Sequence, residues 1–213
     1  MSVYWILLLL TAVVAYLIGG MDTMVLASNF VFHRNLRRLG DTGRWFSNFR
    51  RLYGAGGFLR LLAVELVKDA LPILAGGLLL AIKGHADAGC AFAGFVLVLG
   101  RLWPAVYRFH GSSASVAMIA AAFTAGTSVG AAVLVATAGI TVLTRYISLG
   151  AIAGAIVYAM VTVLAVDDAL LLRLGLLTAG LVLIRHIPAA IRLIRRTEPR
   201  VNTEEDITYK LDE

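Results

Sequence analysis

Two apolar runs near the C-terminus decide the class of fold. The first is ISLGAIAGAIVYAMVTVLAV at residues 147–166, and the second is ALLLRLGLLTAGLVLIR at residues 169–185, with only Asp167-Asp168 between them. An α-helix needs about 20 mainly apolar residues to cross the hydrocarbon core of a bilayer. The two runs therefore predict two membrane-spanning helices joined by a short polar turn.

The composition of the whole chain agrees with this interpretation. Of its 213 residues, 60% are hydrophobic and 15% are charged, whereas a soluble domain has about 45–50% apolar and about 25% charged residues. The excess of apolar side chains also excludes a disordered chain. The single cysteine, Cys90, excludes an intrachain disulfide framework. The net charge is +6. In so apolar a chain, basic residues usually lie on the cytoplasmic rim of a membrane protein, so we predict no nucleic-acid partner.

Further apolar runs predict about seven transmembrane helices. The predicted spans are residues 3 into the twenties, 57–82, 88–106, 114–127, 129–143, 147–166 and 169–185. This count places 14 of the 19 Lys and Arg residues on one face and only Lys83 and Arg173 on the other. By the positive-inside rule, the N-terminus lies outside and the C-terminus is cytoplasmic. We predict an all-α, multi-pass protein with one transmembrane domain at residues 1–197 and a polar cytoplasmic tail at residues 198–213.

Charged residues inside predicted spans are costly and invite a functional hypothesis. Glu65, Lys68 and Asp69 are spaced i, i+3 and i+4, so they share one helical face and can pair. The alternative is a self-neutralised ion pair that docks one helix on another. Arg101 and His186 lie near span ends, where basic residues commonly snorkel or cap a helix.

Pairs of glycines in the predicted spans favour close helix packing. Gly126 and Gly130, like Gly150 and Gly154, are pairs at i, i+4 that let helices approach closely.

Two other groups of residues match no known catalytic or metal motif. Ser112 and Ser113 lie close to His110 but lack a Gly-x-Ser-x-Gly elbow. His85, Asp87 and Cys90 match no zinc spacing, so we predict no metal and no cofactor.

The predicted cytoplasmic loops are rich in arginines, hydroxyl groups and glycines. These loops cover residues 40–51, 103–113, 144–149 and 185–199, and all lie on one membrane face. Guanidinium groups and backbone donors that converge there suit a ligand that carries phosphate. The alternative is attraction to anionic lipid headgroups, worth about 1 kcal/mol for each basic residue near the surface.

Taken in their order along the chain, the loops and their flanking motifs resemble those of the bacterial membrane glycerol-3-phosphate acyltransferases that use acyl phosphate (the PlsY family). The resemblance extends from about residue 15 to residue 199. The motifs that carry the resemblance are Ala15-Tyr16-Leu17-Ile18-Gly19, Arg37, Ser47-Asn48 with Arg51, Glu65-x-x-Lys68, Gly100 with Trp103-Pro104, Phe109 with Gly111, Arg145-Tyr146-x-Ser148-Leu149, His186, Arg192-Leu193 and Thr197-Glu198.

The resemblance implies a seven-helix fold in the bacterial inner membrane and acyl transfer from acyl phosphate to glycerol 3-phosphate, which gives lysophosphatidate for phospholipid synthesis. Membrane lipid is a further implied partner. His186 is the implied base. The implied substrate-binding residues are Arg37, Asn48, Arg51, Lys68, Arg145, Ser148, Arg192 and Glu198. Among these, Arg51, Lys68 and Arg145 hold phosphate, whereas Asn48 and Ser148 orient it.

Four departures from the family pattern leave a second function open. Gly40-Asp41-Thr42-Gly43 stands where the family has Gly-Ser-Gly-Asn, Gly111-Ser112-Ser113-Ala114 where it has Gly-Gly-Lys-Gly, Arg101 where it has histidine and Ala189 where it has asparagine. Arg101 and Arg108 are the candidates to replace the missing lysine. The alternative to an acyltransferase is a non-catalytic relative that serves as a scaffold or lipid-binding subunit of a membrane complex.

Overall fold

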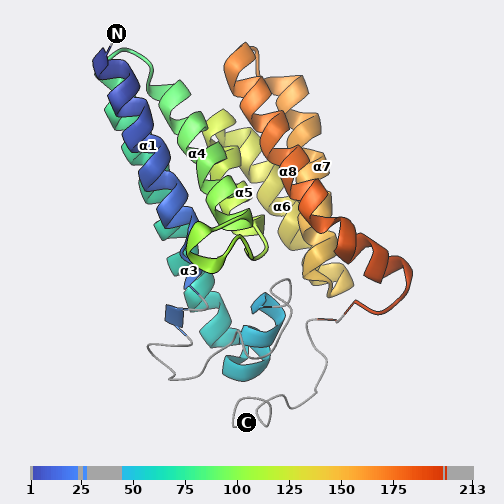
Figure 1. Ribbon diagram of the computed structural model, residues 1–213. Coiled ribbons are helices and arrows are strands. Elements are labelled where there is room, and N and C mark those ends of the chain that lie inside the picture. The colour runs from blue at the N-terminus through green and yellow to red at the C-terminus, as the bar shows by residue number, and fades with distance from the viewer. Residues whose placement is uncertain (1, 24–25, 28–44, 199, 201–213) are drawn as a thin grey trace.

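The computed structural model describes residues 2–23, 26–27, 45–198 and 200; for Ser2 and residues 45–53 it describes the backbone alone. This part of the chain contains seven α-helices and no strand (Figure 1), so the all-α prediction is confirmed. The helices are α1 (Ser2–Gly20), α3 (Trp45–Ala81), α4 (Ala86–Leu102), α5 (Ser115–Ala122), α6 (Thr127–Thr144), α7 (Ile147–Ala165) and α8 (Ala169–Ile194). Short 3₁₀ turns occupy Ala105–Tyr107 and Phe123–Ala125.

Five of the described helices are long and apolar enough to cross a membrane, namely α1, α4, α6, α7 and α8. Helix α3 is longer still, but Glu65, Lys68 and Asp69 interrupt its apolar sequence. Helix α5 has eight residues, which is well short of a bilayer crossing at about 1.5 Å per residue. The number of crossings and the orientation of the chain stay predictions.

Two helices extend beyond the predicted spans. Helix α3 begins at Trp45, and Gly54 interrupts it with φ 71° and ψ 175°, a conformation that glycine adopts without a Cβ clash. Helix α8 continues nine residues past the predicted end at Arg185, through Pro188. A proline removes one hydrogen bond inside a helix, but the turns beyond it still close, with Arg195 N donating to the carbonyl of Ile191 at 3.0 Å.

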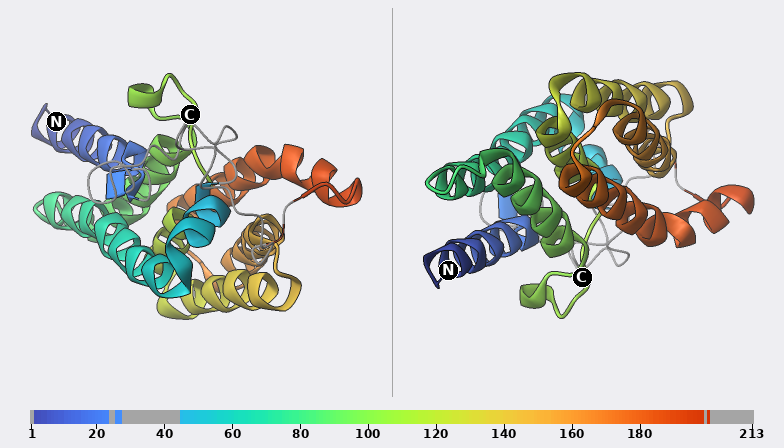
Figure 2. Two further views of the ribbon diagram at one scale, coloured as in Figure 1. Left: turned by 90° about the horizontal axis from the view of Figure 1, so that it is seen from below. Right: turned by 90° about the horizontal axis from the view of Figure 1, so that it is seen from above.

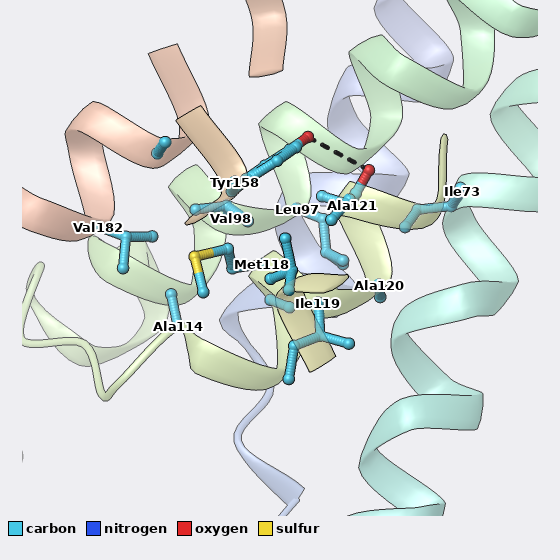
Figure 3. Close-up of a cluster of buried hydrophobic side chains, with 14 of the residues drawn as sticks. Ile73, Leu97, Val98, Ala114, Met118, Ile119, Ala120, Ala121, Tyr158 and Val182 are labelled. Carbon is cyan, nitrogen blue, oxygen red and sulfur yellow. Dashed lines mark hydrogen bonds between the residues drawn. The ribbon is translucent and has the colours of Figure 1, made fainter. Parts of the chain in front are cut away.

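Helix α5 lies at the centre of the bundle. Seen from below and from above, it is surrounded by the longer helices (Figure 2), and it contacts α3, α4, α6, α7 and α8. All eight of its residues are buried. Met118 packs there with Leu97 and Val98 of α4 (Figure 3), and the Tyr158 hydroxyl of α7 donates to the carbonyl of Ala121 at 3.4 Å. Packing on every side therefore fixes the position of both ends of α5.

Helices α6 and α7 approach each other closely where the sequence predicts it. A Cβ atom built on Gly150 would overlap Thr141, and one built on Gly154 would overlap Thr137. Both threonines belong to α6 and both glycines to α7. The small-residue pair at 150 and 154 is confirmed as a site of close helix packing.

Candidate anion and acyl site

A polar cavity of about 40 Å³ lies where the loop before α5, the start of α7 and the last part of α8 meet. Its lining carries three hydroxyl groups, one imidazole and two guanidinium groups. The residues that line it are Ser112, Ser113, Ile147, Ser148, Arg185, His186, Pro188, Ala189 and Arg192. We call it the polar cavity.

Two helices begin at this cavity. Helix α5 starts at Ser115, two residues after Ser113, and α7 starts at Ile147. The first-turn N–H groups of any α-helix lack an intrahelical partner, and neither of these starts has a side-chain cap to bind them. The positive ends of both helix dipoles therefore favour an anion at the polar cavity.

A buried hydroxyl supports the same conclusion. Ser112 is 2% exposed, lines the polar cavity, and its Oγ finds no hydrogen-bond partner among the described residues. Buried polar groups without a partner are rare in folded proteins. The guanidinium groups of Arg185 and Arg192 belong to the same lining. Two guanidinium groups and a buried hydroxyl without a partner among the described residues thus line one small space, a set of groups that suits phosphate.

His186 is buried rather than at the surface. Its 6% exposure corrects the expectation that it snorkels or caps the helix. Its Nδ1 lies 2.8 Å from the carbonyl of Val182. Because a carbonyl only accepts, Nδ1 carries the hydrogen and Nε2 is left as an acceptor in the neutral ring. Nε2 lies 3.4 Å from Oγ of Ser113.

The residues just after α8 fold back on the start of α7. Ser148 donates a hydrogen bond to Oε1 of Glu198, and Arg192 Nε donates to Oε2 of the same carboxylate at 2.6 Å. Two residues further on, Arg200 Nε donates to the Tyr146 hydroxyl at 3.0 Å. Glu198, the first residue of the predicted tail, is 9% exposed. Four predicted site residues, Ser148, His186, Arg192 and Glu198, are thus brought together.

Arg145 lies beside this group, in the turn between α6 and α7. It is exposed and has φ 62°, the left-handed conformation of a helix C-cap. The structure does not test three other predicted residues. Arg37 lies outside the described residues. Asn48 and Arg51 lie on the first part of α3, whose side chains are not described.

Lys68 belongs to a different group, which we call the ion cluster: Asp22, Glu65, Lys68, Asp69 and Arg101. Lys68 Nζ lies 3.0 Å from Glu65 Oε1 and 3.2 Å from Asp69 Oδ1, which confirms the predicted pairing along α3. It also donates to the carbonyl of Met21 at 2.6 Å. Its role in substrate binding stays a prediction from the resemblance.

The expectation that Arg101 snorkels to the surface or caps a helix is wrong. Arg101 is 3% exposed and contacts Glu65, with Asp69 Oδ1 at 3.3 Å and Asp22 Oδ2 at 3.6 Å. Two carboxylates of α3 and Asp22, just after α1, satisfy the guanidinium inside the bundle, so it has no need to reach the surface. Arg108, the other candidate to replace the missing lysine, is exposed and has φ 52°.

An apolar groove of about 320 Å³ adjoins the polar cavity. It runs between α3, α5 and α6, and we call it the apolar groove. Ile147 lines both spaces. Ser115, which also lines the groove, lies 2.7 Å from Ser113 of the polar cavity, Oγ to Oγ. The remaining lining residues include Phe58, Leu62, Leu66, Val116, Ile119, Leu134 and Val142.

The sequence did not single out Arg185 or the two serines as site residues. The missed signal for Arg185 is helical spacing: Arg185, Ala189 and Arg192 recur at i, i+4 and i+7 and so share one face of α8. For Ser113, the neighbouring His110 is a misleading cue. That imidazole is exposed, with Nδ1 2.7 Å from the carbonyl of Arg108, and the histidine beside Ser113 comes from 73 residues away.

Fold and site together define a multi-pass membrane protein in which a polar cavity lined by two arginines and three serines adjoins an apolar groove. A sequence model of the glycerol-3-phosphate acyltransferase family matches residues 9–196. The chain belongs to this family, and the resemblance noted above is confirmed.

Individual relatives cover nearly the whole chain. A glycerol-3-phosphate acyltransferase of Streptococcus pyogenes serotype M5 (strain Manfredo) is 31% identical over 205 residues, 90% of this chain and 92% of the relative. One of Thermoanaerobacter sp. (strain X514) is 24% identical over 198 residues, 93% and 98% of the two chains. The crystal structure of PlsY, an integral membrane glycerol 3-phosphate acyltransferase, in its glycerol 3-phosphate form matches with a TM-score of 0.77 at 23% identity, over 91% of this chain and 94% of that one.

Proposed function

We propose that this chain is a glycerol-3-phosphate acyltransferase of the bacterial inner membrane that takes its acyl group from acyl phosphate and makes lysophosphatidate for phospholipid synthesis. One observation carries the proposal. Ile147 lines both a cavity built for an anion and a groove built for a hydrocarbon chain. An acyl phosphate and its lysophosphatidate product each combine these two chemistries in one molecule.

In this proposal, Arg192, Arg185 and the starts of α5 and α7 bind phosphate, while Ser148 and Glu198 orient the substrate. Arg145 supplies a further charge from the neighbouring turn, and Arg37, Asn48 and Arg51 complete the phosphate contacts, as the family resemblance implies. The lysine that the family carries before α5 is absent here. Two helix dipoles and a buried hydroxyl, Ser112, supply the missing stabilisation.

His186 serves as the base. Its Nδ1–H donates to the carbonyl of Val182, and its Nε2, left as an acceptor, lies 3.4 Å from Oγ of Ser113 in the lining of the polar cavity. An imidazole held in this way can act as a general base. Acyl phosphate is already an activated mixed anhydride. The protein therefore has to position two anions, remove one proton and stabilise the departing phosphate.

The decisive test is an assay of the full-length chain, purified and returned to lipid nanodiscs, with palmitoyl phosphate and radiolabelled glycerol 3-phosphate. We expect labelled lysophosphatidate to form above the background of empty nanodiscs, and Arg192→Met to reduce its formation. An active family member assayed in parallel verifies the substrates. If only that control forms product, the enzymatic proposal fails and the chain is a non-catalytic relative.

A further inference from the structure

A second apolar space continues the apolar groove along α3 and α5. It has a volume of about 510 Å³ and lies between α3, the start of α4 and the turn that follows α5. We call it the distal hollow. Leu66 lines both the groove and the hollow, so the two spaces meet at this side chain. The residues that line the hollow are Leu66, Val67, Ala70, Ile73, Leu74, Asp87, Cys90, Ala120, Phe123 and Thr124.

The two linings follow one another along α5. Residues 115–119 contribute to the apolar groove, and residues 120–124 contribute to the distal hollow. The nine steps from Ser115 to Thr124 correspond to about 14 Å at about 1.5 Å per residue. The hydrocarbon core of a bilayer is about 30 Å thick, so the acyl chains of one leaflet extend over about 15 Å. An acyl chain that starts at the polar cavity is therefore long enough to reach the distal hollow.

The junction between the two spaces is apolar and packed. Leu66 packs against Val116 and also against the main core, which includes Ile73 and Ala120. These three partners are buried, so they form the floor of the path. Val67 is exposed at the edge of the hollow. The path is therefore open along one side, where a chain can enter from the lipid.

The polar residues of the distal hollow do not call for a polar ligand. The Thr124 hydroxyl already donates to the carbonyl of Ala121 at 2.7 Å. Cys90 is a free cysteine, and such a residue behaves as a small hydrophobic group. Asp87 is exposed in the first turn of α4. A hydrocarbon that covered this carboxylate would remove its water at a cost, so the lining disfavours chains that extend as far as Asp87.

We propose that the distal hollow holds the methyl end of the acyl chain, and that Leu66 and Ala70 set the chain length that the protein prefers. This inference rests on the proposed function and deepens it by assigning substrate specificity to a space away from the reacting atoms. Lipid tails are as apolar as the hollow, so the preference comes from packing. A chain of the right length fills the hollow, whereas a shorter chain loses those contacts.

Photolabelling locates the end of the chain without any substitution. The probe is palmitoyl phosphate with a diazirine next to its methyl end, given to the full-length protein in nanodiscs without glycerol 3-phosphate. We expect adducts on the peptides that line the distal hollow, including the one with Phe123, and protection by excess unlabelled palmitoyl phosphate. Decanoyl phosphate with a diazirine at the same end should label the apolar groove instead, including the peptide with Val116.

Competition between chain lengths tests the two side chains. The protein receives equal amounts of octanoyl, decanoyl, dodecanoyl, myristoyl and palmitoyl phosphate together with glycerol 3-phosphate, and mass spectrometry gives the ratios of the lysophosphatidates formed. Ala70→Phe, which fills the distal hollow, should lower the ratio of palmitoyl to decanoyl product about tenfold. Leu66→Trp, at the junction, should shift the preference to still shorter chains. Ala63→Phe is the control, because Ala63 is exposed on the same helix and lies outside both linings.

These ratios do not depend on the fraction of protein that is active, so a variant that folds poorly still gives a result. If both variants keep the ratios of the unchanged protein, or the palmitoyl probe labels other surfaces without protection, the inference is overturned while the proposed function stands. If the unchanged protein forms no lysophosphatidate from any chain length, the proposed function fails. Photolabelling then decides by itself whether the distal hollow binds an acyl chain.

Discussion

Arg192 donates its Nε–H to Glu198 Oε2 at 2.6 Å, and this contact ties the last turn of α8 to the segment that follows it. Ser148, in the first turn of α7, donates to the other oxygen of the same carboxylate. Arg192 and Ser148 both line the polar cavity. One carboxylate thus holds an arginine and a hydroxyl group in position at the place where we propose that phosphate binds.

Glu198→Ala should weaken the binding of glycerol 3-phosphate. Without the carboxylate, Arg192 loses a charge-assisted hydrogen bond and the orientation that it imposes. A loss of about 1.4 kcal/mol corresponds to a tenfold change in binding, so we expect the KM for glycerol 3-phosphate to rise about tenfold, with a smaller change in kcat. Arg195→Ala, exposed at the end of α8, is the control. A lower KM in Glu198→Ala would show instead that the carboxylate competes with substrate for Arg192.

Arg145 allows the role of its charge to be separated from its role in the fold. Its φ of 62° suits glycine better than any residue with a Cβ atom. Arg145→Gly should therefore be about 1 kcal/mol more stable than Arg145→Ala, as measured by unfolding in denaturing detergent. If the guanidinium binds substrate, both variants should raise the KM for the phosphate-bearing substrates equally. Unchanged KM values in both variants would restrict Arg145 to the turn.

Loss of a charge from the ion cluster should lower the free energy of unfolding. It holds three carboxylates against two cations, with Arg101 at 3% exposure. Removal of one partner from a buried ion pair costs about 3–5 kcal/mol, so Arg101→Met should lower the free energy of unfolding by that amount. Lys83→Met, at an exposed turn, should have little effect.

A double substitution tests whether charge balance is the cause. Glu65→Gln in the Arg101→Met background restores the original net charge of the cluster. The double variant should lose less stability than the sum of the two single variants, since the two residues are in contact. Strict additivity of the two losses would contradict the charge explanation.

The sequence predicted the helices well because each apolar run ends in a polar or glycine-rich segment. Helix α7 at Ile147–Ala165 differs by one residue from the predicted span. Prediction failed where a local rule was overridden. The end of α8 was placed at Arg185, yet the helix continues through Pro188 to Ile194, and the residues of this extension include Ala189 and Arg192 of the polar cavity.

The site was only partly predictable, since the decisive contacts join residues far apart in sequence. The i, i+3, i+4 pairing of Glu65, Lys68 and Asp69 followed from helix geometry, but the arrival of Arg101 from α4 did not. The pairing of Ser113 with His186 depends on the tertiary position of α5, which no local pattern encodes.

Gly150 should tolerate no side chain, in contrast with a glycine of the neighbouring helix. A Cβ atom at Gly150 would overlap Thr141, whereas one at Gly139 would meet nothing within 4 Å. Overpacking typically costs about 1–3 kcal/mol, so Gly150→Ala should lower the free energy of unfolding by that amount. Gly139→Ala should leave it unchanged or raise it by up to about 1 kcal/mol, because alanine favours helix. Equal stability of the two variants would mean that α6 and α7 do not meet at Gly150.

Cysteine labelling should test the predicted orientation. Cys90 is the only cysteine in the chain, so Cys90→Ala gives a background in which single cysteines can be placed. A cysteine at Asp167, in the exposed turn between α7 and α8, should react with a membrane-impermeant maleimide in intact spheroplasts. One at Arg195, at the opposite end of α8, should react only after the membrane is permeabilised, since the arginine-rich face is predicted to be cytoplasmic. The reverse pattern would place the polar cavity on the outer side, away from a cytoplasmic supply of phosphorylated substrates.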